Sequence, residues 1–230
     1  MYKVFVADKL APEGVAALER YDELSVDFAP GLGIEEAIDR ARDADAIIVR
    51  SATKIRGQLL DACEKLRVVG RAGIGVDNID VAAATERGIV VLNTPDANAT
   101  TTAELAIAHM FSLSRHIPEA DRSVRAAEWT PAKFLGAELS GKTVGIVGFG
   151  TIGRLVAERC RGLKMKVVGH DPFVTQSTFE EHGVDVLELD VLLGEADYVT
   201  LHCPVTDDTR GLIGADRLAL MKSGARLINC

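Results

Sequence analysis

The sequence predicts an α/β fold built from two parallel-sheet domains. Short apolar runs rich in β-branched residues alternate with helical stretches along the chain. Several runs, such as AIIV at 46–49, are apolar at every position, which is typical of parallel strands buried on both faces. A Gly-x-Gly-x-x-Gly motif at 148–153 follows one such run and precedes a helical stretch. We expect a flavodoxin-like domain at 1–97 and a Rossmann-like domain at 98–230.

The composition is that of an acidic globular protein. Of 230 residues, 47% are hydrophobic and 26% are charged, and the formal net charge is -8. This charge argues against binding to nucleic acid or to an anionic membrane surface, and we expect neither partner. No apolar run is long enough to cross a bilayer, and no signal peptide precedes the first strand pattern. The four cysteines, at 63, 160, 203 and 230, lack metal-ligand spacing, so we expect free thiols, no metal and a cytoplasmic location.

In the first half, the expected strands and helices alternate as in a parallel sheet covered on both faces. Strands are expected at 3–7, 24–29, 46–49, 66–69 and 89–92, and helices at 12–20, 34–42, 58–63 and 81–87. A glycine-rich loop is expected at 70–76. Active groups of such sheets gather at the carboxyl ends of the strands, so we expect the functional residues there.

In the second half, a turn-rich break at 93–98 precedes helices at 100–113 and 118–128 and an irregular stretch at 129–141. Leu105, Ala108 and Phe111 share one side of the first helix. Strands are then expected at 144–147, 166–169, 184–187, 198–203 and from 226, and helices at 154–163, 178–183, 191–195 and 218–222.

Each glycine of the motif has its own expected role. Gly148 allows a sharp turn, Gly150 lets a pyrophosphate approach the backbone, and Gly153 lets the helix pack close to the strand. Free N–H groups at the helix start then face the phosphates. Asp171 ends the next strand, about 20 residues on, where a dinucleotide fold places the carboxylate that binds the adenosine ribose. A tight turn with an exposed Asp and a methyltransferase-like fold are the less favoured alternatives.

Arginines follow two strands of the first half. Arg50 and Ser51 come directly after AIIV, and Arg71 comes after RVVG. A guanidinium is a planar fork that matches two oxygens of a carboxylate or phosphate, and its charge does not titrate away. Either arginine alone is most simply a surface residue. Two at equivalent strand ends of an acidic protein favour a site for an anionic substrate.

Six segments of the chain carry a family resemblance. They are RSATKI (50–55), VGRAGIGVDNID (69–80), NTPDANATTTAEL (93–105), ELSGKTVGIVGFGTIGR (138–154), HDP (170–172) and LINC (227–230). With these segments the chain resembles the D-isomer-specific 2-hydroxyacid dehydrogenase family, in particular its branch that acts on phosphoglycerate. The resemblance implies hydride transfer between NAD and the C2 carbon of a 2-hydroxy acid. For the branch that it resembles, this implies oxidation of 3-phosphoglycerate to 3-phosphohydroxypyruvate, the entry to serine synthesis.

By position, the resemblance also implies site residues on each domain. The substrate carboxylate or phosphate would contact Arg50, Ser51, Arg71 and the backbone from Gly73 to Gly75, with Asn98 nearby. The cofactor would contact Gly148, Gly150, Thr151, Ile152 and Gly153 at its pyrophosphate and Asp171 at its ribose, with Ile74 and Cys203 on the nicotinamide side and Cys230 also at the cofactor. Pro172 and Phe173 follow Asp171, with no Arg to pair a 2'-phosphate, so NAD is preferred over NADP.

The family's catalytic Arg, Glu and His come after a strand like LINC, and the sequence stops at Cys230. We therefore expect no catalytic residue within 1–230 and a fragment that does not turn over. The first domain would lack its returning C-terminal helix, and the second would be incomplete. None of the five histidines is a convincing acid–base substitute. His202, on an apolar strand, is expected to be a satisfied core residue.

Two functional alternatives stay open. A glyoxylate, hydroxypyruvate or other D-2-hydroxyacid reductase would use the same scaffold. A non-catalytic NAD-sensing protein would also lack the catalytic His. If the family pattern holds, the helices at 100–128 form the contact of a homodimer or of a higher oligomer.

Overall fold

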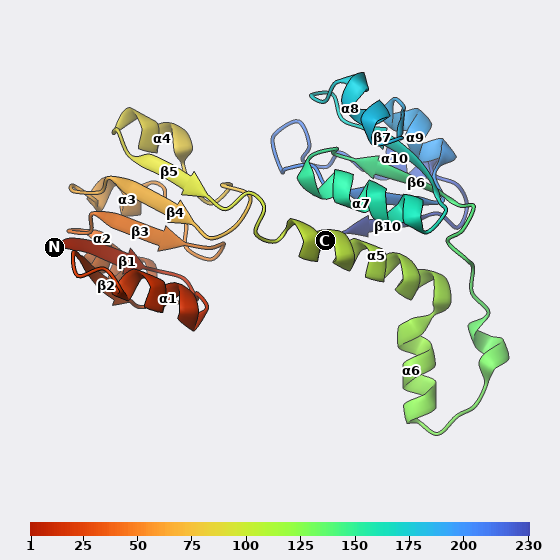
Figure 1. Ribbon diagram of the computed structural model, residues 1–230, viewed down its shortest axis with the longest axis horizontal. Helices are drawn as coiled ribbons and strands as arrows, with labels where there is room; N and C mark the ends of the chain where they lie inside the picture. The colour runs from red at the N-terminus through yellow and green to blue at the C-terminus, as the bar shows by residue number, and fades with distance from the viewer. The chain divides into compact units, whose positions relative to one another are not determined.

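The computed structural model describes residues 1–230 as two compact units, Met1–Asn98 and Ala99–Cys230 (Figure 1). Each unit contains one five-stranded sheet of parallel strands, with helices between successive strands. The predicted α/β class with two parallel sheets is confirmed. None of the helices is both long enough and apolar enough to span a lipid bilayer.

The sheet of the first unit has the strand order β2-β1-β3-β4-β5. Its elements are β1 (Tyr2–Val6), α1 (Pro12–Glu19), β2 (Leu24–Phe28), α2 (Ile34–Ala41), β3 (Ala46–Val49), α3 (Gln58–Ala62), β4 (Val68–Arg71), α4 (Val81–Glu86) and β5 (Val90–Asn93). This is the flavodoxin order, in which the direction of winding reverses between β1 and β3. The carboxyl ends of β1, β3 and β4 are neighbours, and Asp8, Arg50 and Arg71 lie at these ends.

One core holds the first unit together. Phe5 of β1, Ile47 of β3 and Val69 of β4 are completely buried, and Leu59 of α3 and Ala84 of α4 belong to the same cluster. Full burial of a large apolar side chain contributes roughly 1.5–3 kcal/mol, so this cluster is the main stabilising force of the unit. It fixes the strands whose ends carry the polar residues.

The sheet of the second unit has the order β10-β9-β6-β7-β8. Its elements are α5 (Ala99–Arg115), α6 (Ile117–Arg125), a 3-10 helix (Pro131–Phe134), β6 (Thr143–Val147), α7 (Thr151–Gly162), β7 (Lys166–His170), α8 (Gln176–Glu181), β8 (Asp185–Val186), α9 (Leu189–Glu195), β9 (Tyr198–Leu201), α10 (Ala215–Leu220) and β10 (Arg226–Asn229). The first strand, β6, lies between β7 and β9, as in a dinucleotide-binding fold. α6 and the 3-10 helix extend away from this sheet (Figure 1).

Helices cover both faces of the second sheet. Ile146 packs in one cluster with Met110 of α5 and Val156 of α7. The next residue, Val147, faces the other side and packs in a second cluster with Leu192 of α9. The alternation of side chains along β6 therefore packs this strand against both helix layers.

One predicted strand boundary was wrong in a way that matters for the site. β4 is Val68–Arg71, two residues later than the predicted 66–69. Leu66 is buried before the strand begins, and Gly70 stays in register with Ile48 of β3. Arg71 is therefore the last residue of a strand and not part of a loop.

The first helix of the second unit, α5, buries the side on which most residues are small. Ala103, Ala106 and Met110 are completely buried, whereas Leu105 and Phe111 are exposed. Alanines at the contact allow α5 to lie close to α7, and residues of both helices share one buried cluster. The side that carries the larger apolar residues faces away from the core of its unit.

Candidate functional site

The turn after β6 requires glycine at position 148. Gly148 has φ of 92°, a conformation that residues with a side chain rarely adopt. A Cβ atom there would lie 2.5 Å from the Cys203 nitrogen. The Gly148 N–H donates to the His170 carbonyl oxygen at 2.9 Å. The chain therefore turns tightly against the ends of both neighbouring strands.

Gly150 and Gly153 differ in their surroundings. α7 begins at Thr151, three residues earlier than predicted, so Gly153 lies in its first turn. A Cβ on Gly153 would be 2.2 Å from the Gly148 carbonyl oxygen, whereas no atom lies within 4 Å of a Cβ on Gly150. Gly153 is thus needed for packing, and the space at Gly150 is open. Open space beside the N–H groups of a helix start suits a phosphate.

Phe149 anchors the glycine motif to the core of the second unit. Its ring is completely buried and stacks on Phe179 of α8, with ring centroids 4.2 Å apart. The Arg154 Nε donates to the Phe149 carbonyl oxygen at 3.1 Å. A guanidinium therefore lies beside the motif, where it adds positive charge for a pyrophosphate. Arg154 is absent from the residues predicted from the sequence, although it directly follows the last glycine.

Asp171 is tied to the same motif by its carboxylate. Its Oδ2 accepts a hydrogen bond from the Phe149 N–H at 2.8 Å, and its Oδ1 accepts one from the Phe173 N–H at 2.9 Å. These bonds hold the carboxylate at the end of β7. This is the place where a dinucleotide fold carries its ribose-binding acid.

A cavity of about 430 Å³ lies beside these residues within the second unit. It is lined by Val147, Gly148, His170, Asp171, Pro172, Phe173, Cys203, Pro204, Thr206, Asp208, Thr209 and Leu212. This size is in the range of small-molecule sites, which run from about 300 to 1,000 Å³. Cys203 lines the same cavity as Asp171.

The other predicted cofactor residues lie outside this cavity. Thr151 is exposed at the start of α7, and the Ile152 side chain packs against the core. Cys230 is exposed one residue beyond β10. Ile74 belongs to the first unit, where its carbonyl oxygen accepts a hydrogen bond from Asn93 Nδ2 at 2.6 Å.

Two neighbouring residues at the end of β9 are held in their uncharged forms. Burial raises the pKa of the Cys203 thiol, and the charge of Asp171 raises it further. Burial lowers the pKa of His202 to about 4. Its Nε2 lies 2.9 Å from the Thr200 hydroxyl oxygen. His202 is therefore a neutral, hydrogen-bonded residue and not a base tuned to neutral pH.

Arg71 braces loops in the first unit. Its Nε donates to the Arg50 carbonyl oxygen at 3.0 Å, its Nη1 donates to the Gly75 carbonyl oxygen, and its Nη2 lies 3.5 Å from Asp77 Oδ1. The side chain is only 11% exposed. The sequence predicts an anion-binding fork here, but the structure commits most of this guanidinium to partners within the chain.

The segment after β3 carries cations without ion pairs. Arg50, Lys54 and Arg56 are exposed, and none lies within 4.0 Å of a carboxylate oxygen. Ser51 is exposed between them. Three uncompensated cations within seven residues form a local positive patch in a protein of net charge -8. Lys54 and Arg56 were missed, although they stand in the same RSATKIR stretch.

The glycine-rich loop after β4 offers backbone donors. The N–H groups of Ile74, Gly75 and Val76 donate no hydrogen bond within the chain. Successive free N–H groups form a concave site for anionic oxygens. Gly73 lies between this run and Arg71, and Asn98 is exposed at the last position of the first unit. Across the first and second units, no group of three or more His, Cys, Asp or Glu residues is arranged to hold a metal ion.

Comparison with known proteins assigns the family. Residues 107–230 match the model of the D-isomer specific 2-hydroxyacid dehydrogenase, NAD binding domain. This match includes the glycine motif, Asp171 and every strand of the second sheet. The chain belongs to the D-isomer specific 2-hydroxyacid dehydrogenases. Its second unit is their NAD-binding domain.

Individual relatives agree with this assignment. The chain is 43% identical to D-3-phosphoglycerate dehydrogenase of Methanocaldococcus jannaschii over all of its own length, and it spans 44% of the length of that relative. The crystal structure of TT0316 protein from Thermus thermophilus superposes with a TM-score of 0.90 at 34% identity, covering 99% of this chain and 73% of that one. D-Lactate dehydrogenase from Aquifex aeolicus, complexed with NAD and lactic acid, gives a TM-score of 0.89 at 28% identity, covering 99% and 68%.

Proposed function

We propose that this chain binds NAD and 3-phosphoglycerate for the oxidation of 3-phosphoglycerate to 3-phosphohydroxypyruvate, the reaction that opens serine synthesis. The observation that carries the proposal is the unpaired cation patch of Arg50, Lys54 and Arg56 after β3. A substrate with both a carboxylate and a phosphate needs more positive charge than an unphosphorylated hydroxy acid. Identity to a D-3-phosphoglycerate dehydrogenase supports the same substrate.

On the first unit, two sets of donors near these strand ends would each bind one anionic group of the substrate. Arg50 and Ser51 supply a charged fork and a hydroxyl for one anionic group of the substrate. The free N–H groups from Ile74 to Val76 supply neutral donors for the other. In this proposal Arg71 and the Gly73–Gly75 backbone shape the loop, and Asn98, exposed at the end of the first unit, is a further substrate contact.

On the second unit, the residues present fit a dinucleotide. When bound there, NAD would supply the hydride acceptor. Gly150 leaves open space for the pyrophosphate at the N–H groups of Thr151 and Ile152, and Arg154 adds charge. Asp171 would bind the ribose hydroxyls. It would also repel a 2'-phosphate, which favours NAD over NADP.

None of the five histidines is placed as the acid–base group of this reaction. His170, His182 and His202 each have a ring nitrogen 2.8–3.0 Å from a carbonyl or hydroxyl oxygen of the chain. His109 and His116 lie on or beside α5 and α6, outside the cavity at Asp171. We therefore expect the 230-residue chain to bind both ligands and to reduce NAD far more slowly than a full-length relative does.

Calorimetry with the 230-residue chain tests the proposal. Wild type should bind 3-phosphoglycerate at least tenfold more tightly than glycerate, because a charge-assisted contact is worth about 1.5–3 kcal/mol. Arg50→Gln should remove most of that difference and leave NAD affinity unchanged. Arg42→Gln, an exposed arginine on the same unit, is the matched control.

Three outcomes would change the assignment. Equal affinity for the two acids would favour a reductase of unphosphorylated hydroxy acids. NAD binding without either acid would favour an NAD-sensing protein. NADH formation at the rate of a full-length relative would show that the chain holds its own acid–base group.

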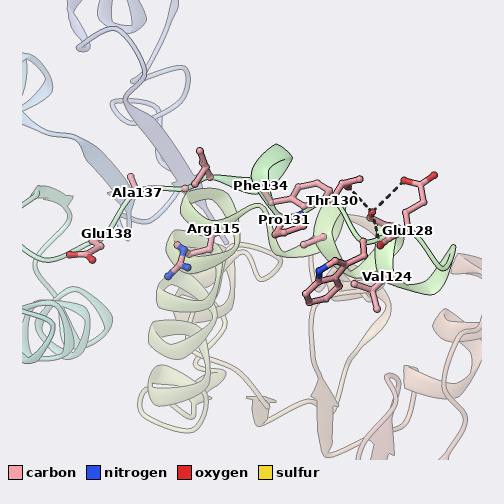
Figure 2. Close-up of a pocket in the computed structure, with 13 residues that line it drawn as sticks. Arg115, Val124, Glu128, Thr130, Pro131, Phe134, Ala137 and Glu138 are labelled. Atoms are coloured by element: carbon pink, nitrogen blue, oxygen red, sulfur yellow. Dashed lines mark hydrogen bonds between the residues drawn. The ribbon is translucent and has the colours of Figure 1, made fainter.

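A homodimer through α5, α6 and the segment after them is part of the same proposal. A cavity of about 520 Å³ there includes Val124, Pro131 and Phe134 in its lining (Figure 2). Trp129 and Leu135, which also line it, are each 82% exposed. Apolar side chains so exposed around a hollow are typical of an interface, and a second copy of this chain is the occupant we propose.

A cytoplasmic location also belongs to the proposal. All four cysteines are free thiols, and two of them, Cys63 and Cys160, are buried. Free thiols persist in a reducing compartment.

A further inference from the structure

Asp8 holds the loop from Arg50 to Thr53 by its backbone. Asp8 lies two residues beyond β1 and is only 4% exposed. Its Oδ2 accepts hydrogen bonds from the N–H groups of Arg50 at 2.7 Å and Ala52 at 3.2 Å. Its Oδ1 accepts from the Thr53 N–H at 3.1 Å and from the Thr53 hydroxyl at 2.6 Å. One buried carboxylate thus engages three of the four N–H groups of this loop.

Asn78 binds the same loop through the carbonyl groups of the loop. Asn78 is only 3% exposed, and its Nδ2 donates to the carbonyl oxygens of Arg50 at 3.0 Å and Thr53 at 2.6 Å. Arg71 Nε donates to the Arg50 carbonyl oxygen as well. The Asn78 Oδ1 atom is buried without a hydrogen-bond partner. The orientation of this amide therefore satisfies its N–H donors and leaves its oxygen acceptor unsatisfied.

These contacts leave one N–H group of the loop without a partner inside the chain. The Ser51 N–H donates no hydrogen bond, and Ser51 is exposed. A free N–H, a hydroxyl and the guanidinium of Arg50 are thus adjacent on one short segment. A segment of exposed residues would not keep this arrangement by itself, because fixing each residue costs roughly 1–2 kcal/mol of conformational entropy.

We propose that Asp8 and Asn78 are positioning residues that fix the Arg50–Thr53 loop so that the Ser51 N–H and hydroxyl bind the carboxylate or phosphate of an acidic substrate. This inference rests on the proposed function for the identity of the substrate. Neither residue touches the ligand; each acts through the loop.

Because Asp8 is negatively charged, the direction in which Asp8→Asn changes 3-phosphoglycerate affinity tests the proposal. An anion beside an anion-binding loop repels the ligand, so its electrostatic effect alone weakens binding. If Asp8 had no positioning role, Asp8→Asn would tighten 3-phosphoglycerate. If Asp8 holds the loop, the same change weakens it, because the new amide presents N–H groups to backbone N–H groups.

The test measures 3-phosphoglycerate and NAD affinity in parallel on the whole chain. Asp8→Asn and Asn78→Ala should each weaken 3-phosphoglycerate roughly tenfold or more, with NAD affinity within twofold of wild type. Thr53→Val, a milder change, removes the hydroxyl and with it the 2.6 Å bond to Asp8 and a 3.5 Å bond to the Ala7 carbonyl oxygen, and it should weaken 3-phosphoglycerate about threefold. Asp45→Asn is the matched control, since Asp45 accepts a backbone hydrogen bond from Lys3 at the opposite end of the sheet.

Tighter 3-phosphoglycerate binding by Asp8→Asn, or equal weakening by Asp45→Asn, would overturn the proposal. Amide hydrogen exchange separates it from the proposed function. The N–H groups of Arg50, Ala52 and Thr53 should be protected in wild type and lose protection in Asp8→Asn, while Ser51 exchanges fast in both. If wild type binds no 3-phosphoglycerate, the proposed substrate fails, and the exchange pattern still decides whether the loop is held as described.

Discussion

Gly153 shows how one missing side chain determines the cofactor site. A Cβ at this position would lie 2.2 Å from the Gly148 carbonyl oxygen, so the first turn of α7 would have to move away from the motif. Gly153→Ala should therefore destabilise the second unit by about 2–4 kcal/mol and abolish NAD binding. Urea unfolding and calorimetry measure the two effects.

Gly162 provides the control within the same helix. No atom lies within 4 Å of a Cβ at this position. Gly162→Ala should keep NAD affinity and raise stability by up to about 1 kcal/mol, because alanine is the better helix former. If both variants behave alike, close packing at Gly153 is not what the motif requires.

His202 makes the stability of the second unit depend on pH. Its folded pKa of about 4 lies below the ordinary value of 6.5, so the unfolded chain binds a proton that the folded chain excludes. The free energy of unfolding should be unaffected above the ordinary pKa and should fall as the pH drops from there toward 4. Between about pH 7 and pH 5 we expect a loss of roughly 2 kcal/mol. His202→Gln should remove this part of the pH dependence in urea unfolding curves, and an unchanged curve would contradict the assignment.

Single residues were predicted best where one backbone requirement decides the residue type. The positive φ of Gly148 and the tight packing of Gly153 follow from the motif itself. The contacts of Arg71 do not, because the sequence shows a charge and not the carbonyl oxygens that fold onto it. The role of Asp8 was missed for the same reason, since its partners are more than 40 residues away in the chain.

At the scale of elements, α8 supports the glycine motif through Phe179. Phe179 is completely buried and stacks on Phe149. Its ring packs against Gly169 of β7, where a Cβ atom would lie 2.6 Å from the ring. Phe179→Ala should cost about 3–5 kcal/mol of stability and weaken NAD at least fivefold by loosening the motif. Leu193→Ala creates a cavity against the other face of the sheet and should leave NAD affinity unchanged. Equal weakening by both variants would mean that NAD affinity only follows stability.

Most elements could be predicted because hydrophobic periodicity and turn residues act locally. β3 was predicted to the residue, and β4 was displaced by two because a buried Leu66 precedes it. The buried side of α5 could not be predicted from periodicity alone. Its contact with α7 selects small residues, and the larger ones lie outside. Which side of a helix is buried depends on a partner distant in sequence.

At the scale of the whole molecule, each unit has its own core. The cluster around Phe5 contains only residues of the first unit, and the clusters around Ile146 and Leu192 contain only residues of the second. Residues 99–230 alone should therefore fold and bind NAD within about threefold of the whole chain. Circular dichroism and calorimetry on this segment test it. A loss of more than tenfold would show that the first unit contributes to NAD binding.

The assembly of the molecule depends on the apolar segment after α6. Trp129 and Leu135 are the most exposed large apolar residues of the second unit apart from Phe173, which lines the cavity at Asp171. Leaving two such side chains in water forfeits roughly 3–6 kcal/mol of burial, and a second copy that covers them would recover it.

The double variant Trp129→Ser, Leu135→Ser should therefore be a monomer by light scattering at concentrations where wild type is a dimer. Tyr21→Ser, which removes an aromatic residue 61% exposed on the first unit, should leave the dimer intact. The cavity at Asp171, where we propose that NAD binds, shares no residue with this surface, so the monomeric variant should bind NAD with unchanged affinity. A wild type that stays monomeric at high concentration, or a double variant that stays dimeric, would place the contact elsewhere or remove it.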